Sequence, residues 1–98
     1  MKRKLKNPYG KGRRFEYKTR DELKKAGFYV VRQAKSAFPD LFAFNQSGLI
    51  VVECKVGGRL TRIEKNKLRE IRKLNCKTYL AHPVREGRHV KVKFKEEF

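Results

Sequence analysis

Asp40, Glu53 and Lys55 are the residues of this 98-residue chain whose types and spacing could support catalysis. In a strand, Glu53 and Lys55 project from the same face and Cys54 projects from the other. Mg²⁺ prefers carboxylate and carbonyl oxygens, which Asp40, Glu53 and the main-chain carbonyl of Cys54 could supply. The Lys55 ammonium could orient or help deprotonate a water molecule and stabilise charge on a phosphate. This combination suits the hydrolysis of a phosphodiester.

Two neighbouring strands must bring these groups together. Residues 49–56 are rich in β-branched side chains and residues 40–44 are also strand-like, so both segments predict strands. If residues 45–48 form a four-residue hairpin loop, counting outward along both strands places Asp40 opposite Glu53. Charges concentrated beside apolar strands are costly unless they pair or hold a metal, so this point is predicted to be a site.

The rest of the chain predicts two helices and three more strands. One helix is expected over residues 12–26, and the other runs to about residue 74 from the capping-box sequence Thr61-Arg62-Ile63-Glu64. The other expected strands share β-branched and aromatic composition and cover residues 28–34, 77–81 and 89–94. The order α-β-β-β-α-β-β predicts an α/β fold in which helices flank a mixed central sheet.

The composition points to a polyanionic partner. The chain has 27 Lys and Arg against 10 Asp and Glu, a formal net charge of +17. Such a charge in one small domain favours binding to nucleic acid, with an anionic membrane surface as the alternative. We expect residues 1–10 to be a flexible basic arm and residues 11–98 to be a single domain, since residues 1–14 carry seven Lys or Arg and no acid.

Further expectations concern location and redox state. No apolar run approaches the ~20 residues needed to span a bilayer, and no signal-peptide pattern is present, so the chain is expected to be cytoplasmic. Cys54 and Cys76 lack CxxC spacing and grouped histidines, which predicts reduced thiols and no zinc site.

The catalytic pattern resembles a known nuclease signature. Pro39-Asp40, Glu53 and Lys55 match the motif of the PD-(D/E)XK nuclease superfamily, whose members share a restriction-endonuclease-like core. The flanking segments 11–17 and 26–36 are similar to archaeal-type Holliday-junction resolvases, in which a basic helix with a Gly-Arg-x-x-Glu pattern precedes a Gly-Phe-x-Val-x-Arg strand.

This resemblance implies roles for individual residues. Glu16 would be a helix-borne catalytic acid and a possible metal ligand, and Ser36 a loop residue near the scissile phosphate. Asp40 and Glu53 would hold the metal beside the catalytic lysine, Lys55. Such enzymes are homodimers that nick paired strands of a four-way DNA junction with Mg²⁺, for which we expect Mn²⁺ to substitute, and they need no small-molecule cofactor. The predicted phosphate contacts are seven basic residues: Lys11, Arg13, Arg14, Arg32, Lys35, Arg59 and Arg62.

Several alternatives stay open at this point. Residues 57–61 and the following helix are also similar to virus-type replication-repair nucleases, which act on flaps or other branched DNA. A non-enzymatic basic nucleic-acid-binding protein would explain the charge equally well, but it would not explain two facing carboxylates. The charged residues could be a structural ion-pair cluster, and Glu16 could simply pair with Arg20 four residues on. We expect a dimer surface on apolar residues of the second helix or of the terminal strands.

Overall fold

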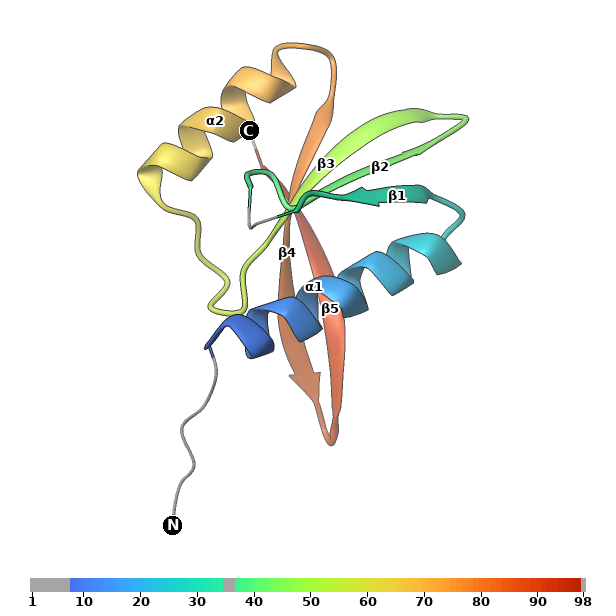
Figure 1. The fold of residues 1–98 in the computed structure, drawn as a ribbon, viewed down its shortest axis with the longest axis vertical. Helices are drawn as coiled ribbons and strands as arrows, with labels where there is room; N and C mark the ends of the chain where they lie inside the picture. The colour runs from blue at the N-terminus through green and yellow to red at the C-terminus, as the bar shows by residue number, and fades with distance from the viewer. Residues whose placement is uncertain (1–7, 35–36, 98) are drawn as a thin grey trace.

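Five strands form one mixed sheet with a helix packed on each face (Figure 1). The computed structural model describes residues 8–34 and 37–97. Most of the predicted arm, together with Lys35 and Ser36, therefore lies outside the described residues. The order of the elements, α-β-β-β-α-β-β, and the mixed sheet are as predicted from the sequence.

Helix α1 runs from Pro8 to Lys25, so it begins four residues earlier than predicted. Proline is well accommodated in a first helical turn, where its missing N–H has no intrahelical partner to lose. The helix buries a stripe formed by Phe15, Thr19 and Leu23. The Thr19 hydroxyl donates to the carbonyl of Phe15 at 2.9 Å, which satisfies a polar group inside this apolar face.

Strands β1 (Tyr29–Arg32), β2 (Leu41–Asn45) and β3 (Gly48–Cys54) form an antiparallel meander. The β2–β3 turn is shorter than the predicted four-residue loop because Asn45 and Gly48 pair with each other. The Asn45 side chain accepts a hydrogen bond from the Ser47 N–H at 2.8 Å and so closes the turn. The predicted pairing register along the two strands is unchanged.

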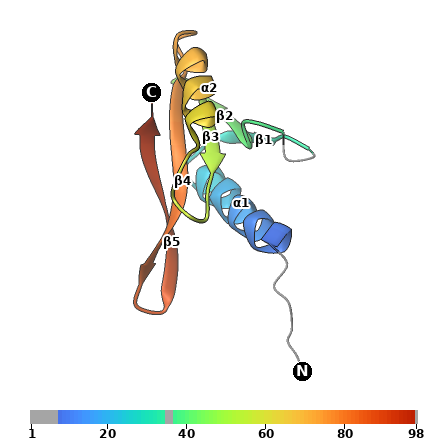
Figure 2. The same cartoon turned by 90° about the vertical axis from the view of Figure 1, so that its left-hand side faces the viewer.

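Helix α2 (Arg62–Arg72) connects β3 to the parallel strand β4 (Lys77–Glu86), which pairs with β5 (His89–Glu97). Both terminal strands are longer than predicted. Strand β3 ends opposite Ala81, so the second half of β4 has only β5 as a partner and tolerates Pro83 there. The β4–β5 hairpin consequently projects beyond the rest of the sheet (Figures 1 and 2).

The two faces of the sheet carry separate apolar clusters. Phe15 and Leu23 of α1 pack on Leu41, Ala43, Val52 and Ala81, whereas Leu68 of α2 packs on Val51 and Cys76. Neighbouring residues of one strand, such as Val51 and Val52, point to opposite faces, so the helices lie on opposite sides of the sheet. Cys54 and Cys76 are free thiols, as predicted.

Candidate active site

Asp40 and Glu53 meet where β2 begins and β3 ends. Leu41 pairs with Val52, so Asp40 and Glu53 occupy the next position outward on the two strands. The Asp40 N–H donates to Glu53 Oε1 at 3.1 Å, and the Cys54 N–H donates to Asp40 Oδ2 at 2.8 Å. These main-chain bonds fix one oxygen of each carboxylate. The structure thus brings the two acids together as the hairpin register predicted.

The two carboxylates place negative charge where water is scarce. Glu53 is only 6% exposed, and burial together with the neighbouring Asp40 charge raises its pKa to about 8. Burial also raises the pKa of Asp40, although the hydrogen bond from Cys54 opposes this shift. A raised carboxyl pKa means that the ionised form lacks enough compensating positive charge. A cation bound at this site would therefore compensate the negative charge of Asp40 and Glu53.

Lys55 supplies only part of that positive charge because a third acid, Glu64, holds its ammonium group. The Lys55 Nζ lies 2.6 Å from Glu64 Oε2 and 3.7 Å from Glu53 Oε2. Burial alone would lower the pKa of Lys55, but its hydrogen bond to Glu64 and the charge of Glu64 raise the pKa overall. One ammonium group shared between Glu53 and Glu64 compensates the charge of Asp40 and Glu53 only in part.

Sequence reasoning missed the contact between Glu64 and Lys55. Thr61 and Glu64 were predicted to open the helix, and the structure confirms that capping box. The Thr61 N–H donates to Glu64 Oε1 at 2.8 Å, and the Glu64 N–H donates to the Thr61 hydroxyl at 3.1 Å. One Glu64 oxygen thus caps α2 while the other holds Lys55. The capping motif in the sequence predicted only the first role, because it does not show where the start of α2 lies relative to Lys55.

Glu16 lies on α1 and faces β1. Its side chain is 12% exposed, and its Oε1 accepts from Arg32 Nε at 3.1 Å. Arg20 instead pairs with Asp21, so the alternative Glu16–Arg20 pair is not formed. Burial and then the charge of Asp40 raise the pKa of Glu16, although Arg32 opposes both effects. The charge of Asp40 therefore acts on Glu16, whose carboxylate is paired with Arg32.

The donor set fits a hard divalent cation that keeps several waters. Among the described residues, no group of three His, Cys, Asp or Glu side chains is arranged to hold a metal. The structure therefore does not place Glu16 with Asp40 and Glu53 in one such group. Two buried carboxylates and the adjacent Cys54 carbonyl still suit Mg²⁺, which is bound through one or two carboxylates and rarely by an all-protein cage.

The predicted DNA contacts differ in their exposure to solvent. Arg32 is half-buried by its pairing with Glu16, and its guanidinium lies 4.9 Å from the centre of the Tyr17 ring. Lys35 and Ser36 lie outside the described residues. The other predicted contacts are exposed to solvent: Lys11, Arg13, Arg14, Arg59 and Arg62. These five remain available to a phosphate backbone.

Two comparisons with known proteins show the family and the fold of this chain. Residues 7–96 match the family described as archaeal Holliday junction resolvase (Hjc). The chain belongs to the archaeal Holliday junction resolvase family. Among solved structures, the Holliday junction resolvase Hjc of the hyperthermophile Archaeoglobus fulgidus is similar, with a TM-score of 0.70 and 30% sequence identity over 88% of this chain and 72% of that chain. Comparison with curated proteins gave no match.

Family membership confirms the predicted fold and activity class. The chain is a Holliday-junction-resolving nuclease with a nuclease fold, and a divalent metal requirement is general for such resolvases. This assignment favours an enzyme over a non-enzymatic basic protein and the resolvase over the virus-type branch. In the described part of the chain, no helix is both long and apolar enough to cross a membrane.

Proposed function

We propose that this resolvase is a Mg²⁺-dependent endodeoxyribonuclease that cuts four-way DNA junctions by paired phosphodiester hydrolysis. The observation that supports the proposal is the joining of Asp40 and Glu53 by main-chain hydrogen bonds, with the Lys55 ammonium 3.7 Å from Glu53. Two anions beside a phosphate-binding surface weaken DNA affinity unless a cation lies between them and the phosphate. A divalent metal removes this conflict.

Asp40, Glu53 and the Cys54 carbonyl would hold the metal ion. When bound, Mg²⁺ acts as a Lewis acid that polarises a phosphoryl oxygen and favours ionisation of water near neutral pH. The main-chain donors to Asp40 and Glu53 hold both carboxylates in place before any ligand arrives. Such preorganisation avoids rearrangement during the reaction. We expect Mn²⁺ to substitute, because it accepts the same oxygen donors.

Lys55 and Glu16 would act on the reacting groups. The Lys55 ammonium, held by Glu64, is a cation that can donate hydrogen bonds to a phosphate oxygen and to the attacking water. Of the two roles considered for it, this geometry supports orientation and charge stabilisation over proton abstraction. Glu16 is paired with Arg32 in the free protein. When a DNA phosphate binds Arg32 instead, the released Glu16 carboxylate would act at the side of the site that faces the substrate.

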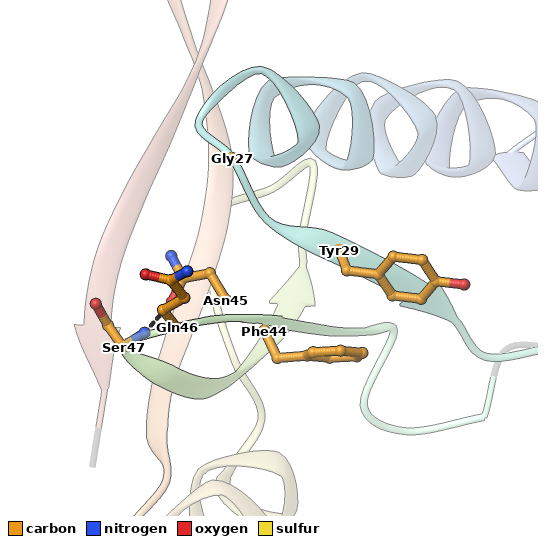
Figure 3. A pocket seen from close by; sticks show the side chains of 6 residues that line it. All are labelled: Gly27, Tyr29, Phe44, Asn45, Gln46 and Ser47. Atoms are coloured by element: carbon orange, nitrogen blue, oxygen red, sulfur yellow. Dashed lines mark hydrogen bonds between the residues drawn. The ribbon is translucent and has the colours of Figure 1, made fainter.

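We further propose that the active unit is a homodimer, because a four-way junction presents two related strands and paired nicks need two centres. The sheet offers an apolar surface for this contact. Tyr29, Phe44 and Leu49 lie side by side across β1, β2 and β3 and are 66%, 41% and 44% exposed. The Tyr29 and Phe44 rings are 5.1 Å apart between centroids (Figure 3).

The exposed row of Tyr29, Phe44 and Leu49 supports a dimer contact on β1, β2 and β3, whereas the sequence led us to expect one on the terminal strands. Tyr29, Phe44 and Leu49 share the face of the sheet on which α2 packs, by alternation with Phe42 and Val51. Helix α2 itself exposes Ile63, in line with the expected use of the second helix, and the turn that follows α2 exposes Leu74. Contiguous exposed apolar surface on a protein with this charge is typical of a protein interface. We also expect the enzyme to act inside the cell, where its DNA substrate is found.

The proposal is tested by comparing cleavage of a four-way junction, a flap, a splayed arm and a linear duplex. With Mg²⁺, we expect paired cuts in the junction and little cleavage of the others. Chelation should abolish cutting, and either Mg²⁺ or Mn²⁺ should restore it. Equal cleavage of all four substrates would contradict junction resolution, and cleavage that survives chelation would contradict the metal role.

A further inference from the structure

A second charged feature lies away from the two carboxylates. A groove of about 440 Å³ is lined by α1 between residues 11 and 18, by Val56 and by the projecting β4–β5 hairpin. Its floor is apolar and includes Phe15 and Val56, and Pro83 and Val90 form part of the hairpin wall. The mechanism proposed above makes no use of this groove.

The polar lining of the groove is entirely cationic. Lys11, Arg14 and Lys18 line it from α1, and Arg85 faces them from β4. Among the described residues that line the groove, none is acidic. Glu86, next along the hairpin, is engaged by Lys91 at 3.0 Å. The four cations therefore concentrate positive potential in a hollow with low-dielectric walls, which strengthens attraction for an anion.

Helix geometry separates this groove from the active site. At 100° per residue, Lys11, Arg14 and Lys18 fall within an arc of about 60° on α1. Glu16, which faces Arg32 and senses Asp40, lies about 140–160° round the axis from all three. The groove and the carboxylates thus lie on opposite flanks of one helix. A phosphate bound between the carboxylates cannot also contact the groove.

We propose that this groove binds the phosphate backbone of a second duplex arm of the junction, different from the arm that enters the active site. The inference rests on the proposed junction-resolving function. Four cations without a lining acid match an extended polyanion, whereas a second copy of this chain, at +17, would be repelled by them. A protein that holds two arms at once distinguishes a junction from linear DNA by geometry alone.

The test compares a groove variant with a charge-matched control. The groove variant carries Lys11→Gln, Arg14→Gln and Arg85→Gln, and the control carries Lys24→Gln, Lys25→Gln and Lys77→Gln at exposed positions outside the groove. Affinity for a labelled four-way junction and for a linear duplex is measured by anisotropy across a salt series in chelator. Each lost phosphate contact should reduce the salt slope by roughly 0.9.

We expect the groove variant to lose at least about tenfold in junction affinity at physiological salt and to have a slope shallower by about two to three. The control variant should match the wild type on the junction, and both variants should bind linear duplex equally. Equal junction slopes in the two variants would overturn the proposal. An equal loss by the groove variant on junction and duplex would also overturn it, since the groove would then contact any DNA.

Footprinting of the wild-type protein keeps the inference testable if the groove variant folds poorly. Junction DNA should protect Lys11 and Lys18 from acetylation, whereas linear duplex should not, and Lys24 should react equally in all samples. Reactive Lys11 and Lys18 in the junction complex would contradict the groove site. Loss of the solution dimer in the groove variant would assign the groove to a second copy instead. Absence of junction cleavage by the wild type would refute the proposed function and leave the binding result to be judged separately.

Discussion

Four charged side chains have different roles at the candidate site: Asp40, Glu53, Lys55 and Glu64. Asp40 and Glu53 are fixed by main-chain N–H groups, so their positions do not depend on any cation. Lys55 is held mainly by Glu64, which also caps α2. The lysine therefore depends on a helix terminus for its orientation. This dependence makes Glu64 a positioning residue that can be tested apart from the carboxylates.

Replacing Glu64 by Gln should slow junction cleavage without unfolding the protein. Gln at this position can still accept from the Thr61 N–H, since either residue completes a capping box. Its amide removes the negative charge that holds Lys55, and a displaced catalytic group costs roughly ten- to a hundredfold in rate. Single-turnover cleavage at saturating enzyme and a thermal unfolding curve measure the two effects.

Thr61→Ala is the matched control for that variant. It removes the hydroxyl that accepts from the Glu64 N–H and should cost about 1 kcal/mol of unfolding free energy. The main-chain N–H of residue 61 can still donate to the Glu64 carboxylate, so Lys55 keeps its partner. The cleavage rate should therefore equal that of the wild type. Slow cleavage in Thr61→Ala together with full activity in Glu64→Gln would show that the cap matters and the charge does not.

Glu53→Gln should stabilise the protein in the absence of divalent ions, and more so at high pH. The pKa of Glu53 rises on folding from its ordinary value of 4.5 to about 8, so the folded state binds the proton more tightly than the unfolded state. The unfolding free energy of the wild type therefore falls as pH rises through this interval. Gln cannot ionise and escapes this loss.

Thermal unfolding in chelator at pH 5 and pH 8 measures the effect. The Tm advantage of Glu53→Gln should be small at pH 5 and larger at pH 8, and Mg²⁺ should reduce it at pH 8 by stabilising the ionised wild type. An advantage that does not change with pH would mean that Glu53 is not held under electrostatic strain.

At the scale of elements, local sequence predicted the site better than it predicted the ends of the strands. Alternation and turn residues were enough to bring Asp40 opposite Glu53, because pairing in a hairpin is local. The ends of β4 and β5 depend on where β3 stops, which is a long-range property, and so Pro83 was not expected within a strand. The Lys55–Glu64 contact was missed for the same reason, since it requires the packing of α2 on the sheet.

That packing rests on Leu68, the residue of α2 with no solvent exposure. Leu68→Ala should lower the unfolding free energy by about 2–5 kcal/mol, because it removes apolar contacts and leaves a cavity against Val51 and Cys76. The exposed Asn66→Ala on the same helix should change it by less than about 0.5 kcal/mol. Urea unfolding of the two variants gives the comparison, and similar losses in both would contradict this account of the α2 packing.

At the scale of the whole molecule, the cationic groove and the exposed apolar surface lie in different places. The cationic groove lies between α1 and the hairpin, whereas the exposed row of Tyr29, Phe44 and Leu49 lies on the face that α2 covers. A strongly basic chain repels its own copies, so association requires an apolar surface of this kind. The sequence indicated a dimer only through the family resemblance, since exposure of these aromatic residues depends on the folded sheet.

Tyr29→Ser combined with Phe44→Ser should convert the proposed dimer into a monomer and separate the paired cuts. Neither side chain is buried in the single chain, so folding should be retained. Sedimentation equilibrium measures the mass, and cleavage of a junction with both strands labelled measures whether the nicks are made together. A monomeric variant that still makes simultaneous paired cuts would contradict the need for two joined centres.

The most direct test of the account is cleavage and binding of one four-way junction by Asp40→Asn. The asparagine keeps the size of the side chain and an oxygen that can accept from the Cys54 N–H, but it removes one of the two charges proposed to hold the metal. We predict that Mg²⁺-dependent cleavage falls by at least about a hundredfold, while junction affinity is unchanged or higher because an anion has been removed from the phosphate-binding surface. Wild-type cleavage by Asp40→Asn would contradict the two-carboxylate site.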